Sequence, residues 1–371
     1  MRILIATGLY APDIGGPATY TAFLEKHLPL HGISYEVLPY GRVRCFPKLF
    51  RHVAYLALLL WHARRTDIFY ALDTVSVGFP VMVASWLTRT PYLLRVPGDY
   101  AWEQGSIRYG ITETLDEYLT HTRHPWRVGI LAWLQKKVAM RAYHVIVPSE
   151  YLKRVVSAWG VSQEKITRVY SALKTIAVAD AKDNLKTIYG YNNFTVTTAG
   201  RLVPWKGMSA LIDVVCEMRK DGTPVTLEII GDGVLRSEIS AHVTKMNASE
   251  YVHLRGAVTR EELAQRVYAS DAFVLNTAYE GLSHQLLEVM SLDIPTVTTP
   301  VGGNTELVDD GVTGILVPYN DVQQMKEALM RLCADSTLRD TLAKNAHASL
   351  EKFYEDVVVG ELVTLLKTFS L

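Results

Sequence analysis

The sequence predicts an α/β protein of two domains, each with a parallel sheet covered by helices on both faces. Short apolar strands alternate with helical segments along nearly the whole chain, and this alternation is typical of parallel sheets. The length of 371 residues suits two domains, each large enough to bury its own core. A hydrophobic content of 49% and a charged content of 20% are those of an ordinary globular protein.

The first half begins with an apolar strand over residues 3–6. Gly15, Gly16 and Pro17 then open a helix toward His31, with proline near its first turn, as helix starts prefer. Further elements follow from short apolar runs and from apolar residues at helical spacing. The predicted strands are 68–71, 92–96, 144–147 and 166–172, and the predicted helices are 52–64, 77–87 and 128–141.

A second alternating series begins at Phe194, after a connector over 174–193 that has little apolar periodicity. The stretch T-R-E-E at 259–262 is a capping box that starts a helix through Tyr268. After Asn320 the pattern is helical to the end. The predicted strands are 194–199, 225–230, 252–254, 272–276, 296–299 and 315–317.

Composition excludes several classes of protein. A formal net charge of zero gives no support to a general nucleic-acid binder. Cys45, Cys216 and Cys333 are scattered, which predicts neither a disulfide framework nor a metal site. The chain starts directly with a strand, so no signal peptide is expected, and the longest apolar run, 53–61, is too short to span a bilayer. We expect a cytoplasmic protein.

Glu280 and Glu288 are the most informative pair of residues, in N-T-A-Y-E-G-L-S-H-Q-L-L-E-V-M-S. A strand-like segment ends just before this stretch, and Ser283 is a plausible N-cap for an apolar helical pattern. Glu280 should therefore lie in a loop at the carboxyl end of a strand, and Glu288 on the first turns of the next helix.

The backbone between these glutamates is expected to bind an anion. The N–H groups of Gly281, Leu282 and Ser283 should lie at a helix N-terminus, which attracts negative charge. Two carboxylates on either side of such a turn suit a nucleotide sugar, with hydroxyls at both ends and phosphate in the middle. Two glutamates at this spacing are also common on any solvated helix, so the surrounding motifs decide between these interpretations.

Two cations precede the glutamates in G-R-L-V-P-W-K-G, which follows a predicted strand. Arg201 and Lys206 should lie at the carboxyl end of the sheet, where open α/β sheets bind ligands. Fixed cations there would stabilise the negative charge of a departing diphosphate without a metal. Taken alone, the two residues are better explained as ordinary surface cations; together with Glu280 and Glu288, we interpret them as functional.

Several motifs occur in a family order over residues 195–318: G-R-L-V-P-W-K-G, I-I-G-D-G, the glutamate stretch, and I-P-T-V-T-T-P-V-G-G-N-T-E-L-V-D-D-G-V-T-G-I-L-V-P. Together they resemble the C-terminal half of the family 4 glycosyltransferases, retaining enzymes with the GT-B fold. That fold has two Rossmann-like domains whose parallel sheets face each other across a cleft. The first half resembles the family more weakly, through its opening strand and Gly15-Gly16.

The resemblance implies which substrate each of the two domains binds. Residues 1–173 would bind the acceptor and residues 194–352 the nucleotide sugar, with 174–193 as the linker. The C-terminal helix, 353–371, would cross back onto the first domain.

The resemblance also implies roles for single residues. Glu280 would bind hydroxyls of the donor sugar and take part in catalysis, and Glu288 would bind the ribose. Arg201 and Lys206 would hold the diphosphate. The remaining donor-binding residues are the glycines of the first loop, the anion-binding turn and the wall of the nucleotide pocket: Gly15, Gly16, Gly281, Leu282, Ser283, Asp232 and Arg255. The glycine pair and the G-D-G turn also have purely structural explanations.

The chain departs from the family pattern at the catalytic centre. Many members carry a histidine where this sequence reads L-L-R-V-P-G-D-Y-A-W-E-Q. Asp99 is the predicted catalytic replacement, because it can orient the acceptor hydroxyl or accept its proton, although it can equally be a turn residue; Glu103 is the next candidate. Y-S-A-L at 170–173 replaces an asparagine-glycine turn, and Asp293 replaces a helix-ending glycine.

The stretch 47–65 combines an apolar helix with basic flanks. It is either a core helix of the first domain or a membrane-surface helix that brings the enzyme to a lipid-linked acceptor. A second cationic and aromatic region contains Trp126, Arg127, Lys136, Lys137 and Arg141.

The sequence thus predicts a retaining hexosyltransferase. It would move glucose or mannose from a UDP or GDP sugar to a glycan or lipid-linked acceptor, in glycan, polysaccharide or glycolipid biosynthesis. No cofactor, metal or nucleic acid is expected, and the enzyme would work in the cytoplasm or at the inner face of the membrane. Two alternatives stay open: a nucleotide-sugar epimerase of the same fold, and a sugar-nucleotide-binding protein with a lapsed active site.

Overall fold

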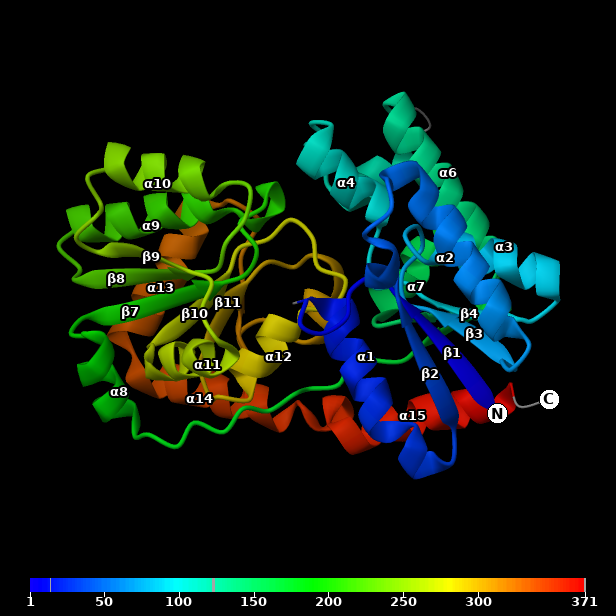
Figure 1. The fold of residues 1–371 in the computed structure, drawn as a ribbon. Coiled ribbons are helices and arrows are strands. Elements are labelled where there is room, and N and C mark those ends of the chain that lie inside the picture. Colours follow the sequence, from blue (N-terminus) through cyan, green and yellow to red (C-terminus); the bar gives the residue numbers. More distant parts are fainter. Residues whose placement is uncertain (14, 122–123, 370–371) are drawn as a thin grey trace. The chain divides into compact units, whose positions relative to one another are not determined.

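The computed structural model describes residues 1–13, 15–121 and 124–369, and it divides into two compact units (Figure 1). The first unit contains residues 1–171 together with the C-terminal segment from Asp356, and the second contains residues 172–355. Each unit has its own six-stranded sheet, in which every pair of neighbouring strands is parallel.

In the sheet of the first unit, the later strands are added on the opposite side of the first strand from the second strand. Its order is β2 (Ser34–Pro39), β1 (Arg2–Thr7), β3 (Ile68–Ala71), β4 (Tyr92–Arg95), β5 (His144–Val147) and β6 (Ile166–Arg168). After β2 the chain crosses back to the other side of β1, so the loops after β1 and β3 diverge at a topological switch point. Ligands of open α/β sheets bind outside the carboxyl ends of the strands at such points.

Helices connect these parallel strands. They are α1 (Gly16–His27), α2 (Lys48–Ala63), α3 (Gly78–Thr88), α4 (Tyr100–Arg108), α5 (Leu115–Thr120), α6 (Trp126–Arg141), α7 (Glu150–Ala158) and α15 (Glu355–Thr368). The helix α2 packs against α3, and α3 packs against α6, so these three form one layer of the unit. The last two residues of the predicted helix 353–371 lie outside the described residues.

The second unit matches the sequence-based prediction strand for strand. Its sheet order is β12 (Ile315–Leu316), β11 (Thr296–Thr298), β10 (Ala272–Leu275), β7 (Phe194–Ala199), β8 (Val225–Ile230) and β9 (Val252–Gly256). The sheet grows from β7 through β9 and then restarts on the other side of β7. The switch point of this unit therefore lies between β7 and β10.

The helices of the second unit cover this sheet around a continuous apolar core. They are α8 (Lys182–Tyr189), α9 (Met208–Lys220), α10 (Arg236–Lys245), α11 (Arg260–Ala269), α12 (His284–Met290), α13 (Val322–Ala334) and α14 (Ser336–Ala348). Short 3₁₀ turns occur in both units at Pro29–His31, Tyr40–Val43, Gln163–Lys165, Pro204–Lys206, Gly302–Glu306 and Glu351–Phe353.

The structure refines three local predictions. The segment predicted as a connector contains the two-turn helix α8 and lies within the second unit. The Thr259 side chain caps α11 by accepting the Glu262 N–H at 3.1 Å, but the Glu262 carboxylate accepts from Arg266 at 2.8 Å rather than completing a capping box. Asp293 adopts the left-handed conformation expected of a helix-ending glycine, with φ 56°.

Candidate donor site in the second unit

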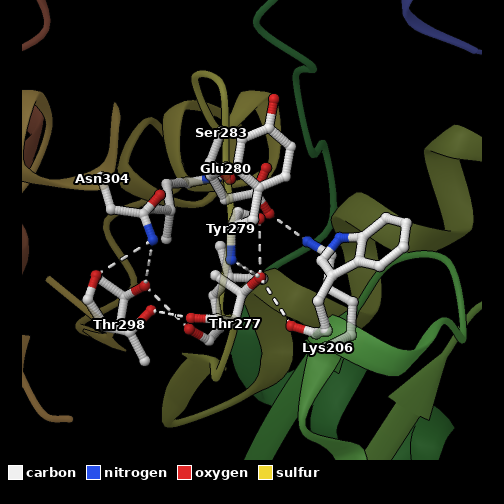
Figure 2. A network of polar contacts seen from close by, with 11 residues as sticks. Lys206, Thr277, Tyr279, Glu280, Ser283, Thr298 and Asn304 are labelled. Carbon is white, nitrogen blue, oxygen red and sulfur yellow. Dashed lines mark hydrogen bonds and ion pairs between the residues drawn. The ribbon is translucent and has the colours of Figure 1, made fainter. Parts of the chain in front are cut away.

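Lys206 and Glu280 form an ion pair that joins the two loops of the switch point. Lys206 follows β7 and Glu280 follows β10, and the ammonium of Lys206 donates to Oε1 of Glu280 (Figure 2). Their side chains are only 13% and 17% exposed. The sequence-based prediction placed both residues in the donor site, and the structure brings them into direct contact.

The backbone around Lys206 is fixed by residues that follow β10. The Ala278 N–H and the Thr277 hydroxyl both donate to the carbonyl of Trp205, at 2.8 and 3.1 Å. The Asn276 amide donates to the carbonyl of Gly207 at 2.8 Å. Because its neighbours on both sides are tied to the adjacent strand end, Lys206 is held in position by backbone contacts as well as by its ion pair.

Glu280 is held from its other side by the loop after β11, of which Figure 2 labels Asn304. The Gly303 N–H donates to the Glu280 carbonyl at 2.9 Å, and a Cβ atom on Gly302 would overlap that same carbonyl oxygen. Asn304 ties this loop to its own strand by donating to the Thr298 hydroxyl at 3.1 Å. The G-G-N motif therefore permits a close approach of two backbones that positions Glu280.

Glu288 lies on α12, as predicted, and is paired with Arg260, which no sequence motif singled out. The Ser283 hydroxyl caps α12 by accepting the Leu286 N–H at 3.2 Å. Arg260 donates to Oε1 of Glu288 at 2.5 Å and to the carbonyl of Lys174 at 3.1 Å. Burial raises the pKa of the Glu288 carboxyl, and the charge of Arg260 opposes that rise.

The carboxylate of Glu288 can still accept further hydrogen bonds. An ionised carboxylate offers about four lone-pair positions, so a single donor does not saturate it. The helix α12 has only seven residues, so the predicted anion-binding turn of Gly281, Leu282 and Ser283 depends on local N–H groups more than on a long helix dipole.

The G-D-G motif joins the loops after β7 and β8. A Cβ on Gly231 would overlap the carbonyl oxygen of Gly200, and the Leu202 N–H donates to the Asp232 carbonyl at 3.0 Å. The Asp232 side chain is exposed and accepts the N–H of Gly233 at 2.7 Å. Asp232 therefore lies on the same edge of the sheet as Lys206, and its contact with a nucleotide stays a prediction.

Arg201 and Arg255 occupy different environments on this edge. Arg201 is exposed, with its guanidinium carbon 5.9 Å from the ring centroid of Trp205. Arg255, near the end of β9, donates to both carboxylate oxygens of the fully buried Glu228, at 2.6 and 2.9 Å. Hydrogen bonding to Glu228 raises the pKa of Arg255. In the structure Arg255 and Arg266 neutralise this buried carboxylate together, and the contact of Arg255 with a nucleotide stays a prediction.

In the first unit, Gly15 and Gly16 begin α1, as predicted: Gly15 is its N-cap and Gly16 its first residue.

Asp99 is fully buried. Its Oδ1 caps α4 by accepting the Trp102 N–H at 2.9 Å, and it also accepts from the Gln135 amide at 2.9 Å. Burial raises the pKa of the Asp99 carboxyl. This geometry favours the structural explanation of Asp99 that the sequence left open.

Asp73, a residue that sequence reasoning missed, occupies the switch point of the first unit. It follows β3, and its Oδ1 accepts the N–H groups of Val75 and Val77, both at 3.0 Å. A Cβ on Gly8, in the loop after β1, would lie 2.7 Å from Oδ2 of Asp73. The only signal in the sequence was an aspartate directly after a buried strand.

The predicted site residues thus fall into two sets. Arg201, Lys206, Asp232, Arg255, Glu280, the 281–283 turn and Glu288 belong to the second unit, and Gly15, Gly16 and Asp99 to the first. Over the parts of the chain that the structure describes, no group of three or more His, Cys, Asp or Glu side chains is arranged to hold a metal ion.

Two family models match the chain, one for each half. Residues 9–172 match the glycosyl transferase 4-like domain, and residues 186–349 match the glycosyl transferases group 1. A relative from Methanocaldococcus jannaschii, the uncharacterized glycosyltransferase MJ1178, is 32% identical over 97% of this chain and 96% of its own length.

Other relatives match over shorter stretches. The alpha-D-kanosaminyltransferase of Streptomyces kanamyceticus is 29% identical, over 58% of this chain and 58% of its own length. An Escherichia coli enzyme, the UDP-Gal:alpha-D-GlcNAc-diphosphoundecaprenol alpha-1,3-galactosyltransferase, is 30% identical over 47% of this chain and 46% of its own. The chain thus spans about half the length of these two relatives.

Solved structures share the whole fold at low identity. Anabaena HepE in complex with UDP-glucose superposes with a TM-score of 0.79 and 20% identity, covering 99% of this chain and 100% of that one. Sucrose-phosphate synthase from Thermosynechococcus elongatus gives a TM-score of 0.81 at 18% identity, covering 99% and 98%.

The two parallel sheets define the fold class as that of the GT-B glycosyltransferases. The chain belongs to the group 1 glycosyl transferases, so it is a glycosyltransferase.

Proposed function

We propose that the protein is a retaining hexosyltransferase that takes a sugar from a nucleotide diphosphate donor and transfers it to an acceptor hydroxyl. The observation that carries this proposal is the Lys206–Glu280 pair at the β7–β10 switch point, with Glu288 on the helix that follows. One edge of one sheet thus presents a cation for the diphosphate and two carboxylates for hydroxyls. The donor is a UDP or GDP sugar, and the named relatives that use or bind UDP sugars make UDP the first base to test.

The proposed chemistry uses fixed charges rather than a metal. As the bond from the anomeric carbon to the diphosphate breaks, negative charge grows on the leaving oxygen, and Arg201 and Lys206 stabilise it. The acceptor oxygen bonds to the anomeric carbon from the same face, and its proton passes to the departing phosphate oxygen. Glu280 orients the sugar and Glu288 the ribose, since a site built to bind hydroxyls rejects ligands that lack them.

The proposed acceptor is a glycan or a lipid-linked sugar, and the proposed setting is the cytoplasm, with peripheral contact to the inner face of the membrane. The E. coli relative acts on a diphosphoundecaprenol-linked acceptor, which supports a lipid-linked class. Gly15 and Gly16 remain the proposed contribution of the first unit to the donor. For Asp99, we expect the helix-capping role rather than the catalytic one, and Asp99→Asn distinguishes the two.

The test is turnover with a panel of donors and acceptors. UDP-glucose, UDP-galactose and GDP-mannose are incubated with and without an undecaprenyl-diphosphate-linked sugar or a free sugar. Nucleotide release is measured, and the anomeric configuration of the product is read by NMR. We expect release that depends on the acceptor and an α-linked product from an α-linked donor.

Other outcomes favour the alternatives. Loss of the donor without an acceptor, with a new sugar configuration, would assign the protein as an epimerase. Tight donor binding with no turnover across the panel would assign it as a lapsed binding protein. A β-linked product would contradict retention and leave the transferase assignment standing.

A further inference from the structure

The helix α2 exposes an apolar face to solvent as well as burying one. Phe50, Val53 and Trp61 are 62%, 64% and 74% exposed, and Ala57 is exposed between them. Their spacing of three to four residues places them on one side of the helix, while Tyr55 and the opposite side are buried in the unit. In the stretch 47–65, α2 is therefore a core helix that also presents an apolar surface to solvent.

The helix α6 repeats this arrangement. Trp126, Ile130 and Trp133 are 70%, 54% and 59% exposed, and the same helical face continues through Lys137 to Met140. These residues follow each other at intervals of three or four, as one stripe on a helix. A soluble helix ordinarily turns such a stripe toward a core, so this one lacks a covering layer within the unit.

The helix α3 contacts both of the helices that carry these stripes. It packs against both α2 and α6, and Figure 1 shows these three helices gathered in the first unit. Trp86 and Leu87 at its end are 75% and 52% exposed. Exposed apolar side chains that occur singly need no explanation, but aromatic residues on three packed helices indicate an interaction surface.

The charged residues of the layer formed by α2, α3 and α6 are basic. The stretches 37–66, 74–98 and 118–149 contain α2, α3 and α6, and none of them contains an Asp or Glu, in a chain with 38 Lys and Arg and 38 Asp and Glu. Carboxylates bound these stretches: Glu36 and Asp67 flank the first, Asp73 and Asp99 the second, and Glu117 and Glu150 the third. Glu36 pairs with Arg2 and His62 at 3.2 and 3.0 Å, and Asp99 accepts from Gln135 of α6 at 2.9 Å. The basic residues beside the apolar stripes include Arg51, Arg64, Arg65, Arg89, Lys137 and Arg141.

We infer that the exposed face of α2, α3 and α6 docks on an anionic phospholipid bilayer. Tryptophan side chains favour the headgroup level of a membrane, where one end of the ring system is apolar and the other wet. Lysine and arginine near an anionic leaflet add attraction at each position. No helix in the described part of the chain is long and apolar enough to cross a membrane.

A surface hollow at the end of α2 fits the same partner. It measures about 380 Å³ and is lined by Arg2, Glu36, Trp61, His62, Arg64 and Arg65. Three arginines beside an exposed tryptophan suit the phosphate of a lipid headgroup, because a guanidinium binds phosphate in a bidentate manner. The charge of the face favours a bilayer over a second copy of the chain, whose identical basic face would repel it. The inference does not depend on which donor the second unit binds.

The test is co-sedimentation of the full chain with lipid vesicles. Vesicles of phosphatidylcholine alone are compared with vesicles that also contain phosphatidylglycerol, at low and at raised salt. We expect binding to the anionic vesicles only, weakened by salt. Because each basic residue near the surface contributes about fivefold, Lys137→Glu/Arg141→Glu and Arg64→Glu/Arg65→Glu should each lower binding at least roughly thirtyfold.

The apolar contribution is measured with Trp61→Ser/Trp133→Ser, which keeps every charge and should weaken binding at both salt concentrations. The matched control is Lys245→Glu/Lys344→Glu, two exposed lysines of the second unit, which should bind like the wild type. Melting temperature and nucleotide-sugar binding without vesicles confirm that each variant is folded.

Three outcomes would overturn the inference. The first is a wild-type protein that ignores anionic vesicles, and the second is a control variant that loses as much binding as the others. The third is a dimer in sedimentation velocity that Lys137→Glu/Arg141→Glu dissociates, which would assign the face to a second copy. Turnover with a water-soluble acceptor is measured separately, so failure of the donor site cannot be mistaken for failure of the membrane face.

Discussion

At the scale of single residues, the donor site already contains partners for its own charges before a ligand arrives. Glu280 holds Lys206, and Arg260 holds Glu288. A partly buried carboxylate keeps its charge more readily beside a cation. A diphosphate would compete with Glu280 for Lys206, which would release the carboxylate toward the hydroxyls of the sugar. The two ion pairs therefore give each carboxylate of the candidate donor site a fixed cationic partner.

We predict that Glu280→Gln and Glu288→Gln fold but weaken use of the donor, the first chiefly through the sugar and the second through the ribose. Loss of one charged hydrogen bond costs about 1.5–3 kcal/mol, which is roughly ten- to hundredfold in kcat/KM. The control is Glu250→Gln, an exposed glutamate of the same unit. Wild-type kinetics in both site variants would remove the two glutamates from the donor site.

A second prediction concerns the fixed cations. If Arg201 and Lys206 stabilise the diphosphate, activity should persist in EDTA, and Arg201→Ala should lose more activity than chelation does. Removing one such charge-stabilising group typically costs about a hundredfold or more in kcat. The measurement is the initial rate of both proteins with and without chelator. Turnover that EDTA abolishes and that Mg²⁺ or Mn²⁺ restores would contradict this mechanism.

Asp99 gives a third prediction, because a catalytic and a capping role have different consequences. If Asp99 is a positioned proton acceptor, Asp99→Asn should slow transfer about a hundredfold without affecting donor binding. The observed burial and the bonds to Trp102 and Gln135 lead us to expect little change in transfer. Asp99→Ala should instead lose the cap, at about 0.5–2 kcal/mol of stability.

The pH dependence of stability gives Asp99 an independent readout. Burial raises its folded-state pKa above the ordinary value of 3.8, so the folded protein binds more protons than the unfolded chain between those two values. Its contribution to the free energy of unfolding therefore decreases as pH rises through that window. Asp99→Asn should remove this decrease. Transfer slowed a hundredfold in a fully folded Asp99→Asn would restore the catalytic assignment, whereas unchanged transfer would leave Glu103 as the next candidate.

At the scale of elements, prediction succeeded where burial on both faces leaves an unbroken apolar run. The strands β7 and β8 have the predicted bounds, because buried parallel strands combine such runs with turn residues at each end. The strand β2, S-Y-E-V-L-P, was missed because it lies at the edge of its sheet and only Leu38 is buried. The helix α8 was missed because Leu185 is its one fully buried residue.

The glycine motifs needed the structure to be explained. In the sequence, G-D-G indicated ligand contact through a family resemblance, and G-G-N was part of a family motif without an assigned role. In the structure, Gly231 and Gly302 allow neighbouring strand-end loops to approach each other's backbone. The partners of the predicted charges, Arg260 above all, could not be predicted, since nothing local in a sequence links Glu288 to a residue on another helix.

The fourth prediction compares two glycines with similar backbones. Gly302 and Gly311 have φ of +57° and +71°, but only Gly302 lacks room for a Cβ, which would overlap the Glu280 carbonyl. Gly311→Ala should cost about 1–2 kcal/mol through its left-handed backbone alone. Gly302→Ala should cost about 1–3 kcal/mol more, because the loops must move apart, and it should weaken donor use by displacing Glu280. Equal unfolding free energies in urea would show that the loops adjust freely.

At the scale of the whole molecule, the two units share a sheet topology but carry different polar residues in the loops at its switch point. In each, a sheet restarts beside its first strand, and the loops at that point carry polar residues. The second unit presents the Lys206–Glu280 pair there, whereas the first presents Asp73 against Gly8. Ion pairs occur beside both switch points: Lys206 with Glu280 in the second unit, and Arg44 with Asp13, in the loop after β1, in the first. In the second unit the pair is followed by Glu288 on α12, and on this combination we propose that unit for the donor.

The fifth prediction uses the stability of the whole protein to identify the donor. A ligand that binds only the folded state stabilises it by mass action, by about 2.7 kcal/mol at a hundred times its Kd. We expect one family of nucleotide sugars, sharing base and sugar, to raise the melting temperature most, and its free nucleoside diphosphate to raise it less.

The glutamate variants supply the internal control for this panel. Glu280→Gln should lower the shift from the nucleotide sugar toward that from the free diphosphate, because it removes contacts to the sugar. Glu288→Gln should lower both shifts, because both ligands carry the ribose. If every ligand shifts the melting temperatures of the two variants alike, Glu280 and Glu288 do not bind different parts of the donor. If no nucleotide sugar shifts the wild-type melting temperature, the switch point of the second unit does not bind the donor in the absence of an acceptor.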